Sequence, residues 1–270
     1  MGNKDEKKRR IVNAIAAAAA FFAVFALSRL LSAAAYALLV TDGSHLPAGV
    51  NAAIWAVSLG AGCALALAVV RPRREAENVI PEEVRKPLRA GAVYLVPAAL
   101  FLLLAVNITI SLTGLGSAEV PSYSTREFII RAILGCTVYP ILEETFFRGV
   151  LLGALRERDD PFLLRLAAVA ATAAAFAAVH PDGGFVFTFI AGVILAAIAP
   201  YGTSEGRRSV IPVGAIAAHA LYNLSLYVSL ALTKAGAEPI VPLSAIAGIA
   251  AVTAGIMLLT GGKSRWKEKK

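Results

Sequence analysis

The sequence predicts an all-α membrane protein, a polytopic bundle of about eight transmembrane helices, and three observations support this fold class. Hydrophobic residues make up 58% of the 270 residues and charged residues 16%, against about 45–50% and about 25% in soluble domains. The apolar residues are gathered in runs of the length that crosses a bilayer, about 20 residues. The Lys and Arg residues lie mostly between these runs. This pattern excludes a disordered chain, a soluble secreted protein and, despite a net charge of +8, a nucleic-acid-binding protein.

Eight candidate spans follow one another along the chain, and the fifth and sixth are short. The first follows a basic segment, but its apolar run is longer than the roughly 7–15 residues of a signal peptide, so we expect a retained anchor. We expect one transmembrane domain over residues 11–260, with basic tails at 1–10 and 261–270. The candidate spans are Ile11–Val40, Ala48–Val70, Ala90–Thr113, Phe128–Leu152, Leu166–His180, Phe185–Pro200, Pro212–Thr233 and Ile240–Thr260.

The distribution of basic residues predicts that both termini are cytoplasmic. Five groups hold 21 of the 26 Lys and Arg residues, and all five fall on one side of an eight-span arrangement. The loops on the other side carry only Arg126 and Lys234. Because basic loops face the cytoplasm, this side is the inner one, and anionic lipid headgroups attract it. The groups lie within residues 4–10, 71–89, 156–165, 207–208 and 263–270.

Several polar side chains lie inside the predicted spans, where a charge at a helix centre costs about 2.5–3.5 kcal/mol and marks a functional candidate. The fourth span contains Glu143, Glu144 and Arg148, the fifth ends at His180, and the seventh contains His219 and Asn223. These spans hold two of the three histidines in the chain. The third, His45, lies in a predicted outer loop.

Other residues in the spans have structural interpretations. Arg29 and Arg131 lie near the ends of spans and can extend their charged groups toward water. Cys63 and Cys136 each lie within an apolar run, so they form neither a disulfide framework nor a thiolate zinc site.

Helical spacing separates the two adjacent glutamates. Glu144 precedes Arg148 by four residues, which favours an ion pair on one helix face. Glu143 points about 100° around the helix, so it has no such partner and stays available for chemistry. His219 and Asn223 are also four residues apart and share a face. The structural alternatives are a polar contact between helices for Glu143, a helix cap for His180 and interhelical hydrogen bonds for His219 and Asn223.

Three motifs carry a family resemblance. EETFFR at 143–148, FAAVH at 176–180 and HALYN at 219–223 match the patterns EExxxR, FxxxH and HxxxN, in order and each on its own apolar span. Gly149 follows the arginine, as is usual in that family. The sequence therefore resembles the CAAX protease and bacteriocin-processing (CPBP) family of intramembrane proteases, which includes the type II CAAX prenyl endopeptidases. The resemblance covers about residues 127–227 and implies a catalytic core over about 127–230.

The resemblance implies an intramembrane endopeptidase that cuts a peptide or protein near the membrane, of the CAAX type or a peptide precursor. Whether the substrate is prenylated stays open. Glu143 with His180 would activate water, while His219 and Asn223 would hold the oxyanion. Glu144, Arg148 and Phe176 would support them. No serine or cysteine is placed for a covalent mechanism.

The need for a metal is the main chemical alternative. Two histidines and a glutamate can bind zinc and leave one position for water, and that set would be Glu143, His180 and His219. The spacing is not the HExxH of many zinc proteases, so the sequence does not require a metal. We favour a reaction without a cofactor and keep zinc as the alternative.

Two other classes of function remain. A small-solute or ion transporter would also place acids and histidines at mid-membrane, but transporters usually contain repeats with interrupted helices in both halves. Here the motifs lie only in the second half of the chain. A non-catalytic membrane scaffold or immunity protein on the same fold is the third class, and an intact set of motifs argues against it only weakly.

Overall fold

The computed structural model describes residues 2–39, 46–69, 82–113, 124–156, 160–180, 184–199 and 212–267. Every regular element in these ranges is a helix. The elements are α1 (Gly2–Leu39), α2 (Ala48–Val69), α3 (Glu82–Leu112), α4 (Thr125–Cys136), α5 (Val138–Glu144), the π-helix η1 (Thr145–Leu151), α6 (Leu152–Leu155), α7 (Phe162–Ala178), α8 (Phe185–Ile198), α9 (Val213–Lys234) and α10 (Ile240–Lys267). Four of them, α2, α7, α8 and α9, begin and end within a few residues of predicted spans, since the length of an apolar run limits where a helix can cross a bilayer. The helices α1, α3 and α10 extend seven to nine residues beyond their predicted spans at one end.

Five helices in the described ranges, α1, α2, α3, α9 and α10, are long and apolar enough to cross a membrane. The helices α7 and α8 are apolar but shorter, and α4 to α6 follow one another along the fourth predicted span. The prediction of an all-helical membrane bundle is therefore confirmed. The number of eight crossings stays a prediction.

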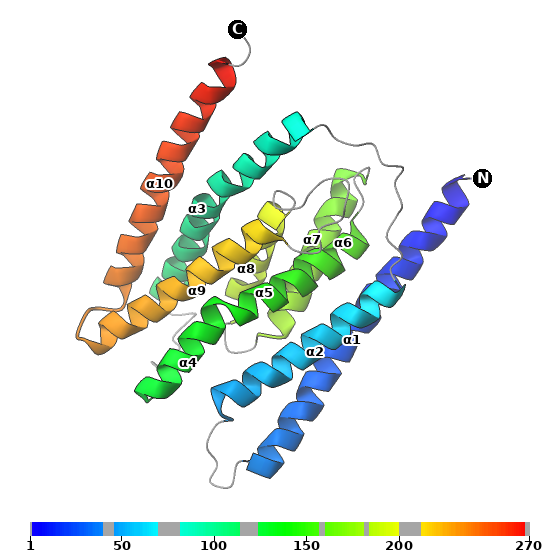
Figure 1. Ribbon diagram of the computed structural model, residues 1–270, viewed down its shortest axis with the longest axis horizontal. Coiled ribbons are helices and arrows are strands. Elements are labelled where there is room, and N and C mark those ends of the chain that lie inside the picture. The colour runs from blue at the N-terminus through cyan, green and yellow to red at the C-terminus, as the bar shows by residue number, and fades with distance from the viewer. Residues whose placement is uncertain are drawn as a thin grey trace.

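Both ends of the chain lie at the same end of the bundle (Figure 1). This arrangement fits an even number of crossings but does not tell which side of the membrane the termini face. Several basic residues used for the predicted orientation lie outside the described ranges, among them Arg158 and those at 71–81 and 207–208. His45 of the predicted outer loop also lies outside them. The predicted tails are helical where they are described, since α1 begins at Gly2 and α10 ends at Lys267.

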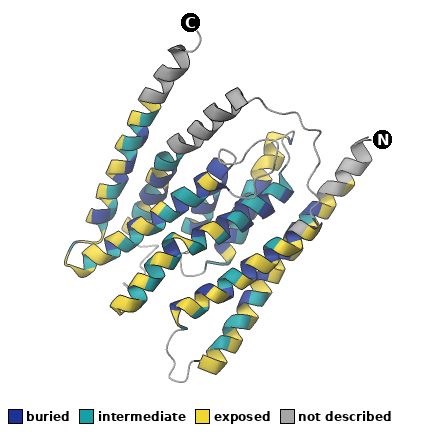
Figure 2. Cartoon of the chain, viewed as in Figure 1, coloured by how far each residue is buried: buried dark blue, intermediate teal, exposed yellow. Residues whose placement is uncertain are grey.

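The helices pack around two apolar clusters. α1 runs along α2, α3 along α10, and α7 along α8 (Figure 1). One cluster joins α1, α2 and η1 through residues such as Val24, Leu59 and Phe146. The other joins α3, α8, α9 and α10 through residues such as Leu104 and Leu195. Buried residues are concentrated in the middle of the bundle, whereas the outer faces of the peripheral helices are exposed (Figure 2).

The fourth predicted span is not one regular helix, which corrects the sequence-based expectation for Phe128–Leu152. The α-helix is interrupted at Thr137, whose backbone angles are φ −126° and ψ −72°. Pro140 lies just after this point and cannot donate a helical hydrogen bond, which weakens the turn before it. The second irregularity is η1, which begins directly after Glu144. Short π-helices of this kind often occur at functional sites.

The fifth and sixth predicted spans form a short helical hairpin. α7 has 17 residues and α8 has 14, so they are about 25 and 21 Å long at 1.5 Å per residue. Both are shorter than the hydrocarbon core of about 30 Å. Whether each of them crosses the membrane stays a prediction. His180, which follows α7, faces Glu143 inside the bundle.

Candidate active site

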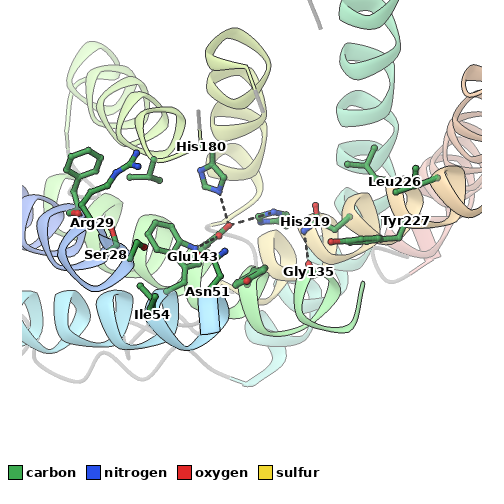
Figure 3. A pocket seen from close by; sticks show the side chains of 17 residues that line it. Ser28, Arg29, Asn51, Ile54, Gly135, Glu143, His180, His219, Leu226 and Tyr227 are labelled. Carbon is green, nitrogen blue, oxygen red and sulfur yellow. Dashed lines mark hydrogen bonds and ion pairs between the residues drawn. The ribbon is translucent and has the colours of Figure 1, made fainter. Parts of the chain in front are cut away.

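Three of the predicted residues meet at one point inside the bundle. Glu143, in α5, is only 4% exposed. Its Oε2 lies 3.5 Å from Nε2 of His180, at the end of α7, and 3.9 Å from Nε2 of His219, on α9. Figure 3 shows both imidazoles directed at this carboxylate. Residues that are up to 76 positions apart in the sequence thus surround one carboxylate oxygen.

Both imidazoles are oriented through their other nitrogen. His180 Nδ1 lies 2.7 Å from the carbonyl oxygen of Phe176, and His219 Nδ1 lies 2.8 Å from Oε1 of Glu144. A carbonyl or a carboxylate oxygen only accepts, so Nδ1 carries the hydrogen in each ring. In the neutral imidazole the lone pair is then on Nε2, which faces Glu143. Each histidine therefore presents an acceptor toward the centre of the site, and becomes a donor there only when it is protonated.

Glu144 connects Arg148 and His219 through one oxygen. It is fully buried, and its Oε1 accepts from Arg148 Nη1 at 3.0 Å as well as from His219 Nδ1. Its Oε2 has no hydrogen-bond partner among the described residues. The ion pair that the spacing of Glu144 and Arg148 predicts is thus present, and Glu144 has a second contact that helical spacing cannot indicate. It holds His219 in place.

The guanidinium of Arg148 is enclosed by polar and aromatic groups. Besides the bond to Glu144, Nη2 donates to the carbonyl oxygen of Gly192 on α8 at 3.2 Å. The charge also lies 4.3 Å from the centre of the Phe176 ring, within the range of a cation–π contact. The same ring packs near His180, with 4.3 Å between the ring centres. Phe176 therefore contacts both the buried cation and the histidine.

Asn223 is tied to the interrupted helix. Its Nδ2 donates to the carbonyl oxygen of Gly135 at 2.7 Å, two residues before the break at Thr137. A side-chain amide has two hydrogens and one acceptor oxygen, so one N–H and the oxygen of Asn223 remain available. The residue also lines the same pocket as Glu143. The bond to Gly135 fixes where that free N–H can point.

A cavity of about 510 Å³ lies over the two histidines and Glu143. Its wall is formed by α1, α2, α4, α5 and α9, and α1 and α2 contribute residues that no motif predicts. The lining extends to Ser32 of α1, Asn51 of α2 and Leu230 of α9. These positions lie near the end of α1, the start of α2 and the end of α9, so the cavity reaches the end of the bundle away from both termini.

Among the wall residues that the sequence analysis does not assign to the site are Arg29 and Trp55. The position of Arg29 in the sequence suggests a cation near the end of a span, but its side chain lines the cavity and lies 5.3 Å from the centre of the Phe25 ring. Trp55 of α2 donates its indole Nε1–H to Oε1 of Glu143 at 2.7 Å. Nothing in the sequence distinguishes Trp55 from an aromatic residue that faces lipid. Arg29 does have a sequence signal, because it is a single positive charge within an apolar run.

The side chains that would bind zinc are those of Glu143, His180 and His219. The Nδ1–H contacts of His180 and His219 are of the kind that orients metal-binding histidines. Nevertheless, no group of three His, Cys, Asp or Glu residues within the described ranges is arranged to hold a metal ion. The expectation of a reaction without a metal stays a prediction.

Residues 125–225 match the family model described as type II CAAX prenyl endopeptidase Rce1-like. The match contains all three motifs and confirms the resemblance to the CPBP family. Neither the curated proteins nor the solved structures give a significant match to the chain. The helices α1, α2, α3 and α10 lie wholly outside the matched segment, although α1 and α2 form one wall of the cavity.

The buried pair of Glu144 and Arg148 leads to a stability prediction. Removing one partner of a buried ion pair typically costs about 3–5 kcal/mol, because the other is left charged and unpaired. We expect Glu144→Ala to lower the melting temperature of the protein in detergent strongly. The double variant Glu144→Gln with Arg148→Met removes both charges and should recover much of the stability.

The exposed pair of Arg131 and Glu127, whose side chains are 26% and 27% exposed, provides the matched control. Pairs at the surface contribute about 0–1 kcal/mol, so Glu127→Ala should change the melting temperature little. An equal loss in Glu127→Ala and Glu144→Ala would contradict this assignment.

Proposed function

We propose that the cavity hydrolyses a peptide bond, so that the protein is a membrane-embedded endopeptidase that uses a glutamate and histidines. The observation that carries this proposal is the position of Glu143. Its carboxylate is buried and faces two oriented imidazoles. The adjacent Glu144 is paired with Arg148. The Rce1-like match over residues 125–225 supports a protease of this class.

The first step would be the activation of water by Glu143 and His180. A water molecule between Glu143 Oε2 and His180 Nε2 can donate one hydrogen bond to each, because both atoms are acceptors. As the water oxygen bonds to the carbonyl carbon of the substrate, its proton passes to Glu143. Positioned general bases of this kind contribute about 10²–10⁴-fold to a rate.

His219 and Asn223 would then stabilise the oxyanion. His219 can donate from Nε2 only when its ring is protonated, and its Nδ1 is held by Oε1 of Glu144. The second N–H of Asn223 is the other candidate donor, since the first is bound to Gly135. Collapse of the tetrahedral intermediate breaks the C–N bond, and the proton held by Glu143 passes to the leaving amine.

Replacement of the proposed base tests this function. Glu143→Gln keeps the size of the side chain and its bond from Trp55, so we expect a folded protein that still binds peptide. Its turnover should fall by at least about 10²–10⁴-fold, as expected for the loss of a general base. The measurement is cleavage of reporter peptides in proteoliposomes, with prenylated and unprenylated forms of one peptide compared.

Glu127→Gln is the matched control, because Glu127 lies on α4 in a half-exposed pair with Arg131 outside the cavity. It should cleave at the wild-type rate. Substantial activity in Glu143→Gln would remove Glu143 from the mechanism, and uptake of a solute with no cleavage would favour a transporter.

Metal dependence is tested separately. If the side chains act without a metal, strong chelators should leave the rate of peptide cleavage unchanged, and the purified protein should contain no stoichiometric zinc. Elemental analysis that found about one zinc per chain, with activity lost on stripping and restored on addition, would establish the metalloprotease instead.

We also propose that both termini are cytoplasmic, as the basic groups predict. The cavity would then open on the outer side of the membrane, because its lining reaches the end of the bundle away from the termini. A reporter fused after residue 270 should be found in the cytoplasm. A reporter found outside would reverse the orientation and place the cavity on the cytoplasmic side.

A further inference from the structure

The carboxylate of Glu143 has its two oxygens in different surroundings. Oε2 faces His180 and His219, whereas Oε1 accepts a hydrogen bond from the indole Nε1 of Trp55 at 2.7 Å. Trp55 belongs to α2, outside the segment that matches the family model and outside all three motifs. This bond is the direct polar link between the N-terminal helices and the proposed base.

The chemistry of indole limits what Trp55 can do. Indole Nε1–H is a donor only, so it can neither take the proton from water nor return it. A bond of this length to a carboxylate is charge-assisted and directional. Because the last torsion of a glutamate side chain is broad and roughly two-fold, such a bond at Oε1 restricts the rotation that would exchange the two oxygens.

The surroundings of the indole point to the same role. Trp55 is half-buried, lines the cavity and packs against the apolar cluster of α1, α2 and η1. Its ring is also edge-on to His180, with 6.5 Å between the ring centres and 83° between the planes. Packing holds the indole ring in place, and its N–H donates to Glu143. The indole can therefore fix the orientation of the carboxylate relative to His180, which shares the proposed water.

We propose that Trp55 is a positioning residue for Glu143, which presents Oε2 to the reacting water and makes α2 part of the active site. This rests on the proposed peptidase function. A role in packing alone would need the aromatic ring but not its N–H, and the two can be separated by experiment.

Trp55→Phe keeps an aromatic ring and removes the donor. We expect kcat for peptide cleavage to fall about 10- to 100-fold, the range for one hydrogen bond to a charged group, with KM and melting temperature nearly unchanged. Trp55→His restores a ring N–H and should recover part of kcat. Tyr36→Phe removes the hydroxyl group of an exposed ring outside the cavity lining, and it should behave as wild type.

A double-mutant cycle distinguishes positioning from packing. If Trp55 acts through Glu143, Trp55→Phe should cause no further loss of residual activity in the Glu143→Gln background. A full additional loss in that background, or a fall in melting temperature that accounts for the loss in Trp55→Phe, would overturn the proposal.

A measurement without catalysis keeps this test separate from the proposed function. The chain has only two tryptophans, Trp55 and Trp266, so ¹⁵N-indole labelling gives two N–H signals, and Trp266→Phe assigns them. We expect the Trp55 signal to lie downfield and to move upfield in Glu143→Ala, while the Trp266 signal stays in place. If the Trp55 signal does not shift in Glu143→Ala, the positioning role is overturned. If the Trp55 signal does shift but the protein cleaves no peptide, the proposed peptidase function is contradicted instead.

Discussion

One carboxylate oxygen, Oε1 of Glu144, accepts from both Arg148 and His219, and the geometry of the bundle interior depends on this arrangement. A buried cation needs a paired and hydrogen-bonded environment, which Glu144, the carbonyl of Gly192 and the ring of Phe176 supply. The same oxygen orients His219 toward Glu143. Stability of the fold and alignment of the site are therefore coupled, because a change at Glu144 disturbs an ion pair and a candidate catalytic histidine together.

The site is assembled from two parts of the chain with different sequence signatures. The segment 125–225 matches the family model and holds the glutamates, the arginine and the histidines. The helices α1 and α2 lie outside it, yet they close one side of the cavity and supply the donor to Glu143 Oε1. In a bilayer, a carboxylate surrounded by lipid would be costly, so the motif residues need such a covering wall. This explains why a match over one segment contains the candidate catalytic groups but only part of their environment.

The sequence predicts the helices well because in a membrane protein the length of each apolar run determines where a helix can lie. It also predicts Glu143, His180 and His219, since polar side chains stand out in apolar spans. Helical spacing indicates the Glu144–Arg148 pair but not the bond from His219, which comes from another helix. The interruption at Thr137 does have a sequence signal, because Pro140 follows it closely. The bond from Asn223 to Gly135 and the contact of Trp55 depend on tertiary packing, and neither has a pattern that differs from ordinary helix composition.

The proposed reaction uses a single water held by Glu143, His180 and His219 without a metal. An experimental structure of the protein in lipid, with anomalous scattering measured on both sides of the zinc absorption edge, is the sharpest test. We expect an ordered water within hydrogen-bond distance of Glu143 Oε2 and His180 Nε2, with no anomalous peak there. A zinc peak within about 2.0–2.2 Å of the histidine nitrogens and the carboxylate would contradict it.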